Sequence, residues 1–230
     1  MTKYVRITFI IFGILFAISF YATARAEEPE RPRVDFTFSK SKEQKITEIS
    51  SLSIENCFTR LKDIDFVIDE NLMYKAIYSS FAHRRSEAIN YAMNYLSLPI
   101  KDVNTGVGRS RTQEFYVAKK VLHVFPDEAA YKLLELYGNS DPVTRGNIIR
   151  VLGRMANGQS IRNLLIDALD DKTPCEERYP EMSGEPLRVC DVAYNQLVLR
   201  YKIQDVLRTI GTVHKIEIRD YHINILRDRL

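Results

Sequence analysis

Beyond Ile54, apolar residues recur three and four positions apart along most of the chain, which is the spacing of one face of an α-helix. This pattern predicts an all-α fold built from several amphipathic helices. The clearest stripe consists of Ile161, Leu164, Leu165, Ala168 and Leu169. Other stripes are Ile54, Cys57, Phe58 and Leu61; Ala88, Ile89, Ala92 and Leu96; Phe115, Ala118, Val121, Leu122 and Phe125; Ile148, Ile149, Leu152 and Met155; and Val189, Val192, Ala193 and Leu197.

Proline, glycine and short polar residues mark where several of these helices begin and end. Pro126 and the pair Asp141-Pro142 suit a first helical turn, where proline loses no hydrogen bond and an aspartate can cap backbone N–H groups. Gly138 is expected to end a helix as a left-handed cap residue. Ser160 is expected to cap the helix that follows.

Two segments near the C-terminus carry weaker patterns. Residues 204–210 contain Val206, Leu207 and Ile210 and are expected to be helical. In residues 214–226, Ile216 and Ile218 alternate with polar residues as they would in a strand. Because the chain offers little other strand signal to pair with, we predict a helix here too.

The predicted helices follow one another in pairs. The second helix of successive pairs is expected to begin near Arg111, Arg145 and Arg188, which gives intervals of 34 and 43 residues. Self-similarity with such a period is typical of a helical solenoid, in which each pair has an apolar face that only a neighbouring pair can cover. We therefore predict a short right-handed solenoid of paired antiparallel helices, with an irregular helical bundle as the alternative.

One unit resembles a HEAT repeat, and the likeness is best over residues 126–169. The residues that carry it are Asp141-Pro142-Val143-Thr144-Arg145, followed by Ile148-Ile149 and Val151-Leu152-Gly153. The resemblance to the HEAT-like superfamily implies that Asp141 and Arg145 are structural and form bonds between adjacent turns. It also implies a scaffold that binds other proteins, although some lyases and glycosylases contain HEAT-like repeats.

The N-terminus has the three parts of a secretion signal. Lys3 and Arg6 precede an apolar run, and Ala24-Arg25-Ala26 is a small-x-small cleavage pattern. We expect a signal peptide over residues 1–26 with cleavage after Ala26, and cleavage after Ala24 as the alternative. The protein would then be exported, periplasmic or secreted, and would contact a membrane only through this segment if it stays uncleaved.

Removal of the signal changes the charge of the chain. The sequence has 33 basic and 30 acidic residues, and loss of Lys3, Arg6 and Arg25 leaves 30 of each. Nucleic-acid binding needs a surplus of positive charge, so we expect no nucleic-acid partner. Residues 27–45 are polar and contain proline, which predicts a flexible leader before a helical-repeat domain over residues 46–230.

Three cysteines remain in the mature chain. Cys175 and Cys190 enclose a stretch without periodicity, and an exported protein meets an oxidising compartment, so we predict a disulfide between them. Cys57 lies on an apolar stripe and is expected to be a buried hydrophobic residue. Neither the cysteines nor the four histidines show metal-ligand spacing, and we predict no metal ion and no cofactor.

No catalytic motif stands out, which leaves the scaffold as the main functional signal. Solenoids bind extended partners on the surface formed by the second helices of each pair. From helical phase alone, the residues predicted to face a protein partner are Asn147, Arg150, Arg154, Asp191, Tyr194 and Asn195. The sequence therefore favours a non-enzymatic protein-binding or scaffolding module of the cell envelope. The alternative is an enzyme or small-ligand-binding protein, which would need a deep pocket with several titratable groups.

Overall fold

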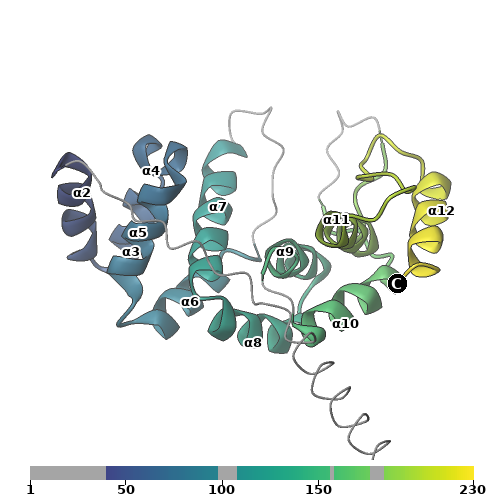
Figure 1. The fold of residues 1–230 in the computed structure, drawn as a ribbon, viewed down its shortest axis with the longest axis horizontal. Helices are drawn as coiled ribbons and strands as arrows, with labels where there is room; N and C mark the ends of the chain where they lie inside the picture. Colours follow the sequence, from purple (N-terminus) through teal and green to yellow (C-terminus); the bar gives the residue numbers. More distant parts are fainter. Residues whose placement is uncertain (1–39, 98–107, 156–157, 177–183) are drawn as a thin grey trace, which may run out of the picture. The chain divides into compact units, whose positions relative to one another are not determined.

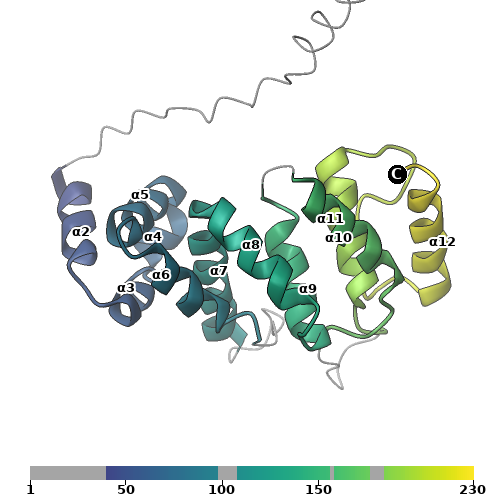
Figure 2. The same ribbon diagram turned by 90° about the horizontal axis from the view of Figure 1, so that it is seen from below.

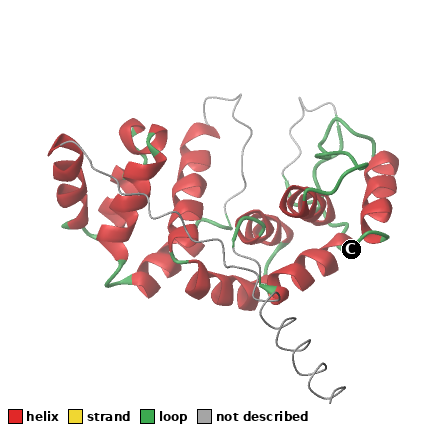
Figure 3. Cartoon of the chain, in the orientation of Figure 1, coloured by secondary structure: helices red, strands yellow, loops and turns green. Residues whose placement is uncertain are grey.

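The structure is a computed structural model that describes residues 40–97, 108–155, 158–176 and 184–230. These residues form eleven α-helices and one short 3-10 helix with no strand among them, which confirms the all-α fold class (Figures 1 and 3). The predicted signal peptide and its cleavage site lie outside the described residues. The helices are α2 (Lys40–Ser50), α3 (Ile54–Arg60), α4 (Ile64–Ile68), α5 (Glu70–Phe81), α6 (Arg85–Met93), α7 (Gly108–Val124), α8 (Pro126–Tyr137), α9 (Pro142–Leu152), α10 (Gln159–Asp167), η1 (Ala168–Asp170), α11 (Val189–Tyr201) and α12 (Ile216–Arg227).

The first described helix, α2, begins inside the segment that was predicted to be a flexible leader. Ile46 and Ile49 are buried, and α2 packs against α5. Lys42 Nζ lies 2.5 Å from Oδ2 of Asp69, the residue that caps the start of α5. The packed helix α2 therefore already begins at Lys40, before the predicted domain boundary at residue 46, and it contains polar residues that were assigned to the leader.

From α6 onward, the helices pack mainly against their neighbours in the sequence. Contacts join α6 with α7, α8 with α9, and α10 with α11, and further contacts join α7 with α9 and α9 with α11 (Figures 1 and 2). We call α7, α9 and α11 the second helices. They begin at Gly108, Pro142 and Val189, close to the positions that the sequence period predicted.

The signals at Pro126 and Asp141 are confirmed. Pro126 is the first residue of α8. Asp141 caps α9: its Oδ1 accepts a hydrogen bond from Thr144 N at 3.0 Å, and its Oδ2 accepts one from the Thr144 hydroxyl at 2.5 Å. Capping by an aspartate satisfies backbone donors that the first helical turn leaves without partners, so this local sequence fixes where α9 begins.

Two other helix-end predictions need correction. Gly138 does end α8 as its C-cap residue, but not in the predicted left-handed conformation. Gly138 has φ −63° and ψ −26°, a right-handed conformation, because the chain continues into a turn in which Ser140 N donates to Tyr137 O. The N-cap residue of α10 is Gly158 instead of Ser160, and the helix already begins at Gln159.

The predicted helix over residues 204–210 is also absent. Its backbone groups bind side chains of α11: Ile210 N donates to Asn195 Oδ1 at 2.7 Å, and Asn195 Nδ2 donates to Ile210 O at 2.9 Å. Lys202 ends α11 with φ 49°, in the left-handed region. By contrast, α12 confirms the helix predicted over residues 214–226.

The predicted disulfide between Cys175 and Cys190 was wrong, since both are reduced and buried in the structure. The ends of the loop are joined by backbone hydrogen bonds, in which Cys175 N donates to Leu187 O at 2.8 Å. Cys175 therefore lies opposite Leu187, and its side chain packs closely against Gly146 of α9. Burial raises the pKa of each of the two thiols to about 12, which keeps them protonated.

Candidate functional site

Three of the six residues predicted to face a partner are buried: Asn147 on α9, and Asp191 and Tyr194 on α11. Asn147 Nδ2 donates to Leu96 O at 2.8 Å, and Tyr194 Oη donates to Leu207 O at 2.6 Å. The helical-phase prediction was wrong for these residues because α9 and α11 pack against other helices on several sides. Their polar groups bind the protein's own backbone and are not available to a partner.

Asp191 lies at the centre of a buried charged network. Its Oδ2 accepts from Arg219 Nη1 at 2.9 Å, and its Oδ1 accepts from Arg188 Nη2 at 2.8 Å. Arg188 also donates to Asp220 Oδ1 at 2.7 Å. Because every member has a charged partner, this network joins α11 to α12 and has a structural role.

The other three predicted residues are accessible to different extents. Asn195 on α11 is half-buried and bonds the backbone of Ile210. Arg154 is exposed just beyond the end of the helix. Arg150 is partly buried, and its Nη2 lies 2.5 Å from Glu176 Oε1. Positive charges near a helix C-terminus are favourable in themselves, so their position alone does not indicate binding.

A second helix brings further positive charges to the same region. Lys119 and Lys120 lie on α7, which packs against α9, and both are partly buried. Lys120 Nζ lies 2.6 Å from Glu70 Oε1 and 5.2 Å from the ring centroid of Tyr116. We call Lys119, Lys120, Arg150 and Arg154 the basic cluster.

Lys119 shows that the basic cluster is electrostatically crowded. Burial, together with the nearby charges of Arg154, Lys120 and Arg150, lowers its pKa to about 8, although Glu70 acts in the opposite direction. Among the described residues, no carboxylate lies within ion-pair distance of Lys119 or Arg154. Two cations of the cluster, Lys119 and Arg154, therefore form no ion pair within the described part of the chain.

Hydrogen bonds fix the end of α9 within this region. His123 Nε2 donates to Val151 O at 2.9 Å from α7, and Arg200 Nη1 donates to Leu152 O at 3.3 Å from α11. These carbonyl groups belong to the last turn of α9, where intrahelical donors run out. Burial lowers the pKa of His123, so the ring is neutral at pH 7 and its role here is structural.

The two lysines of the cluster were missed at the sequence level, although a signal for them exists. Tyr116, Lys119, Lys120 and His123 follow the spacing of one helix face, on the other side of the stripe that contains Ala118. A polar face of this kind is ordinary for a surface helix. Only the packing of α7 against α9, which adds the charges of Arg150 and Arg154, distinguishes this one.

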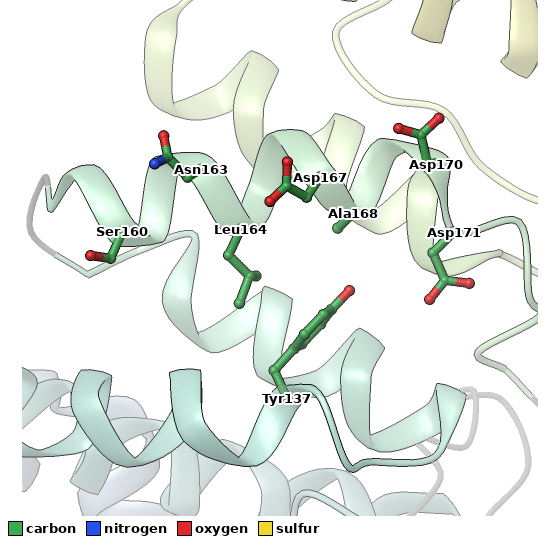
Figure 4. A pocket seen from close by; sticks show the side chains of 8 residues that line it. All are labelled: Tyr137, Ser160, Asn163, Leu164, Asp167, Ala168, Asp170 and Asp171. Atoms are coloured by element: carbon green, nitrogen blue, oxygen red, sulfur yellow. The ribbon is translucent and has the colours of Figure 1, made fainter.

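An open groove of about 690 Å³ lies between the end of α8 and α10 (Figure 4). Its walls include Tyr137, Asp167, Asp170 and Asp171, and we call it the acidic groove. Asp171 pairs with Arg145 at 3.2 Å, and Asp170 pairs with Arg227. Burial, together with the charge of Asp171, raises the pKa of Tyr137 to about 12, so the phenol stays neutral.

Other kinds of site were sought over the same parts of the chain. No group of three or more His, Cys, Asp or Glu residues there is placed to hold a metal ion. None of the described helices is both long enough and apolar enough to cross a membrane. Cys57 is also buried, and burial raises the pKa of its thiol, so it is not a nucleophilic thiolate at neutral pH.

The chain was compared with known proteins by family, sequence and structure. No protein-family model, no curated protein and no solved structure matches it. The class of protein is therefore defined by the fold alone, as an all-α protein. The basic cluster is the candidate functional site that its geometry presents most clearly.

Proposed function

We propose that this protein is an exported, non-enzymatic module that binds or scaffolds another protein through the basic cluster. The observation that carries the proposal is that Lys119 lies on α7 and Arg154 follows α9, two helices that pack together, and that neither cation has a carboxylate within ion-pair distance among the described residues. Crowded positive charge raises the energy of the unbound state, and an anionic surface would relieve it.

The arrangement of helices supports a short right-handed solenoid of the HEAT-like kind as the scaffold. Three successive helix pairs, α6 with α7, α8 with α9 and α10 with α11, pack in sequence order. Arg145 of α9 pairs with Asp171, and its Nη2 donates to Thr173 Oγ1 at 3.1 Å. Asp171 and Thr173 lie between the two helices of the next pair, α10 and α11. Such a bond between units fits the structural role that the HEAT resemblance assigns to Arg145.

The alternative function, an enzyme or small-ligand-binding protein, receives less support. The acidic groove is open to solvent, and two of its three carboxylates already pair with Arg145 and Arg227. A ligand there would have to compete with these ion pairs. A binding surface on the second helices needs no such rearrangement.

Affinity capture tests the proposal. Tagged protein is expressed in its native host, crosslinked mildly, recovered from the envelope fraction and analysed by mass spectrometry. We expect one reproducible protein partner that is lost in the double variant Lys119→Glu/Arg154→Glu. Arg208→Glu is the control, since Arg208 is exposed in the segment before α12 and is not part of the basic cluster. Recovery of the same partner with all three proteins would refute the assignment of the surface.

A further inference from the structure

The basic cluster contains two kinds of cation. Two are already paired with carboxylates of this chain: Lys120 with Glu70 at 2.6 Å and Arg150 with Glu176 at 2.5 Å. The other two are Lys119 and Arg154, and no described carboxylate lies within ion-pair distance of either. Lys119 and Arg154 are therefore the cations of the cluster that remain for an anion from outside the chain.

Lys119 is restrained by its surroundings, and the backbone that carries Arg154 is fixed. Lys119 is half-buried, and its Nζ lies 6.0 Å from the ring centroid of Tyr116. Arg154 follows the last turn of α9, which His123 fixes through its hydrogen bond to Val151 O. A partly buried side chain loses less conformational entropy on binding than a fully exposed one, so Lys119 is prepared for an anionic ligand, and the fixed end of α9 places the exposed Arg154 in the same region.

We propose that Lys119 and Arg154 bind neighbouring carboxylates of an acidic, Asp- or Glu-rich segment of a protein partner. The inference rests on the proposed function and adds the chemical identity of the segment that is recognised. Arg154 supplies a planar guanidinium that can hold a carboxylate with two hydrogen bonds, and Lys119 supplies a point charge beside it.

The charge balance favours a short acidic segment over a polyanion. The four cations of the cluster face Glu70 and Glu176, which leaves two positive charges to be matched. Nucleic acid binding typically engages about 6–10 phosphates, and polybasic membrane sites contain about 4–8 basic residues. A dense polyanion would also approach Glu70 and Glu176, whose negative charges repel it.

Fluorescence anisotropy with a defined probe tests the inference. The probe is a fluorescein-labelled peptide of alternating Glu and Ser residues, and its partner probe has Gln in place of every Glu. We expect the purified protein to bind the Glu peptide and not the Gln peptide. Affinity should fall by about tenfold for Arg154→Gln and for Lys119→Met, because each removes one charged contact.

Arg208→Gln is the matched control and should bind as the unaltered protein does. Arg154 is exposed, so Arg154→Gln is expected to fold normally, and its helical circular dichroism should be unchanged. Equal affinity for the Glu and Gln peptides would overturn the inference. So would equal affinity of Arg154→Gln and Arg208→Gln for the Glu peptide.

Two further probes decide between sources of negative charge. Single-stranded DNA and vesicles of phosphatidylserine and phosphatidylcholine should bind more weakly than the Glu peptide, and tighter binding of either would overturn the inference. The outcome is also separable from the proposed function. If capture finds a partner that depends on Lys119 and Arg154 but the Glu peptide does not bind, only the acidic-segment inference fails.

Discussion

Arg219 of α12 donates from Nη1 to Asp191 Oδ2 of α11 at 2.9 Å, and neither side chain is accessible to solvent. The rest of the Arg219 guanidinium donates to backbone carbonyls, among them Glu185 O at 2.7 Å and His214 O at 2.8 Å. One side chain therefore joins the start of α12, the approach to α11 and α11 itself.

Loss of this arginine should destabilise the protein strongly. Arg219→Met leaves Asp191 buried without one of its two cations, and breaking a buried pair in this way costs about 3–5 kcal/mol of the free energy of unfolding. Urea denaturation followed by circular dichroism measures the change. The control is Lys172→Met, which removes an exposed ion pair to Asp220 at 3.1 Å and should cost at most about 1 kcal/mol. Similar losses for the two variants would contradict the structural role of the network.

Gly153, the C-cap residue of α9, lies close to Gln196 of α11. A Cβ atom at Gly153 would lie 2.5 Å from Cγ and 2.6 Å from Cβ of Gln196, so a larger residue must displace the helix and not only the end of a side chain. Gly153→Ala should therefore lower the free energy of unfolding by about 1–3 kcal/mol.

Gly138→Ala is the natural control for that substitution. A Cβ at Gly138 would meet no atom within 4 Å, and its right-handed backbone conformation suits any residue. Alanine there should raise stability by about 0.4–1 kcal/mol, because it restricts the unfolded chain. The midpoint of thermal unfolding should fall for Gly153→Ala and rise for Gly138→Ala. A change in the same direction for both variants would argue against the close contact between Gly153 and Gln196 of α11.

All three thiols should be reduced and protected in the native protein. Burial raises the pKa of Cys175 and Cys190 to about 12, so little reactive thiolate forms at neutral pH. Alkylation in denaturant without reductant should add three labels, as measured by intact mass, whereas the native protein should react slowly. One label in denaturant would instead indicate a disulfide between Cys175 and Cys190.

Lys119 should make stability depend on pH. Its pKa in the folded protein, about 8, lies below the ordinary value of 10.5, so the unfolded chain holds this proton more tightly. Between these two values the unfolded state binds more protons, and stability therefore rises with pH. Below the folded pKa both states are protonated, and the cost of the buried charge is fully present.

The variant Lys119→Met isolates this effect from other titrations. The difference in free energy of unfolding between the unaltered protein and the variant should shift in favour of the unaltered protein between about pH 7 and about pH 10. Urea titrations at the two pH values measure it. A difference that does not change with pH would show that Lys119 has an ordinary pKa.

The helical core was predictable because the apolar period follows directly from the side chains. Ile148, Ile149 and Leu152 were assigned to the core of one helix from their spacing, and all three are fully buried. The cap at Asp141 was equally predictable, since it depends only on residues next to it in the sequence.

The candidate site was less predictable because it depends on packing between helices. Helical phase assigns a polar residue such as Asn147 to the surface, but α9 is enclosed by α7, α8 and α11, so little of it faces outward. Asp191 was misplaced for a related reason, because the arginine that neutralises it, Arg219, lies far along the chain. Arg150, Arg154 and Asn195 keep some of the exposure that the sequence suggested.

A backbone bridge joins Pro174 to Arg188 and so holds the two ends of the intervening segment together. The packing of the neighbouring helices therefore does not depend on the length of that segment. Closing a flexible loop becomes only slowly more costly as the loop grows, by about 0.6 kcal/mol for each doubling of its length. A peptide epitope or a fluorescent reporter inserted in the segment that this bridge closes would therefore leave the contacts of α10 and α11 in place. The chain thus offers an internal attachment point that leaves both termini untouched, including the one that is expected to direct export.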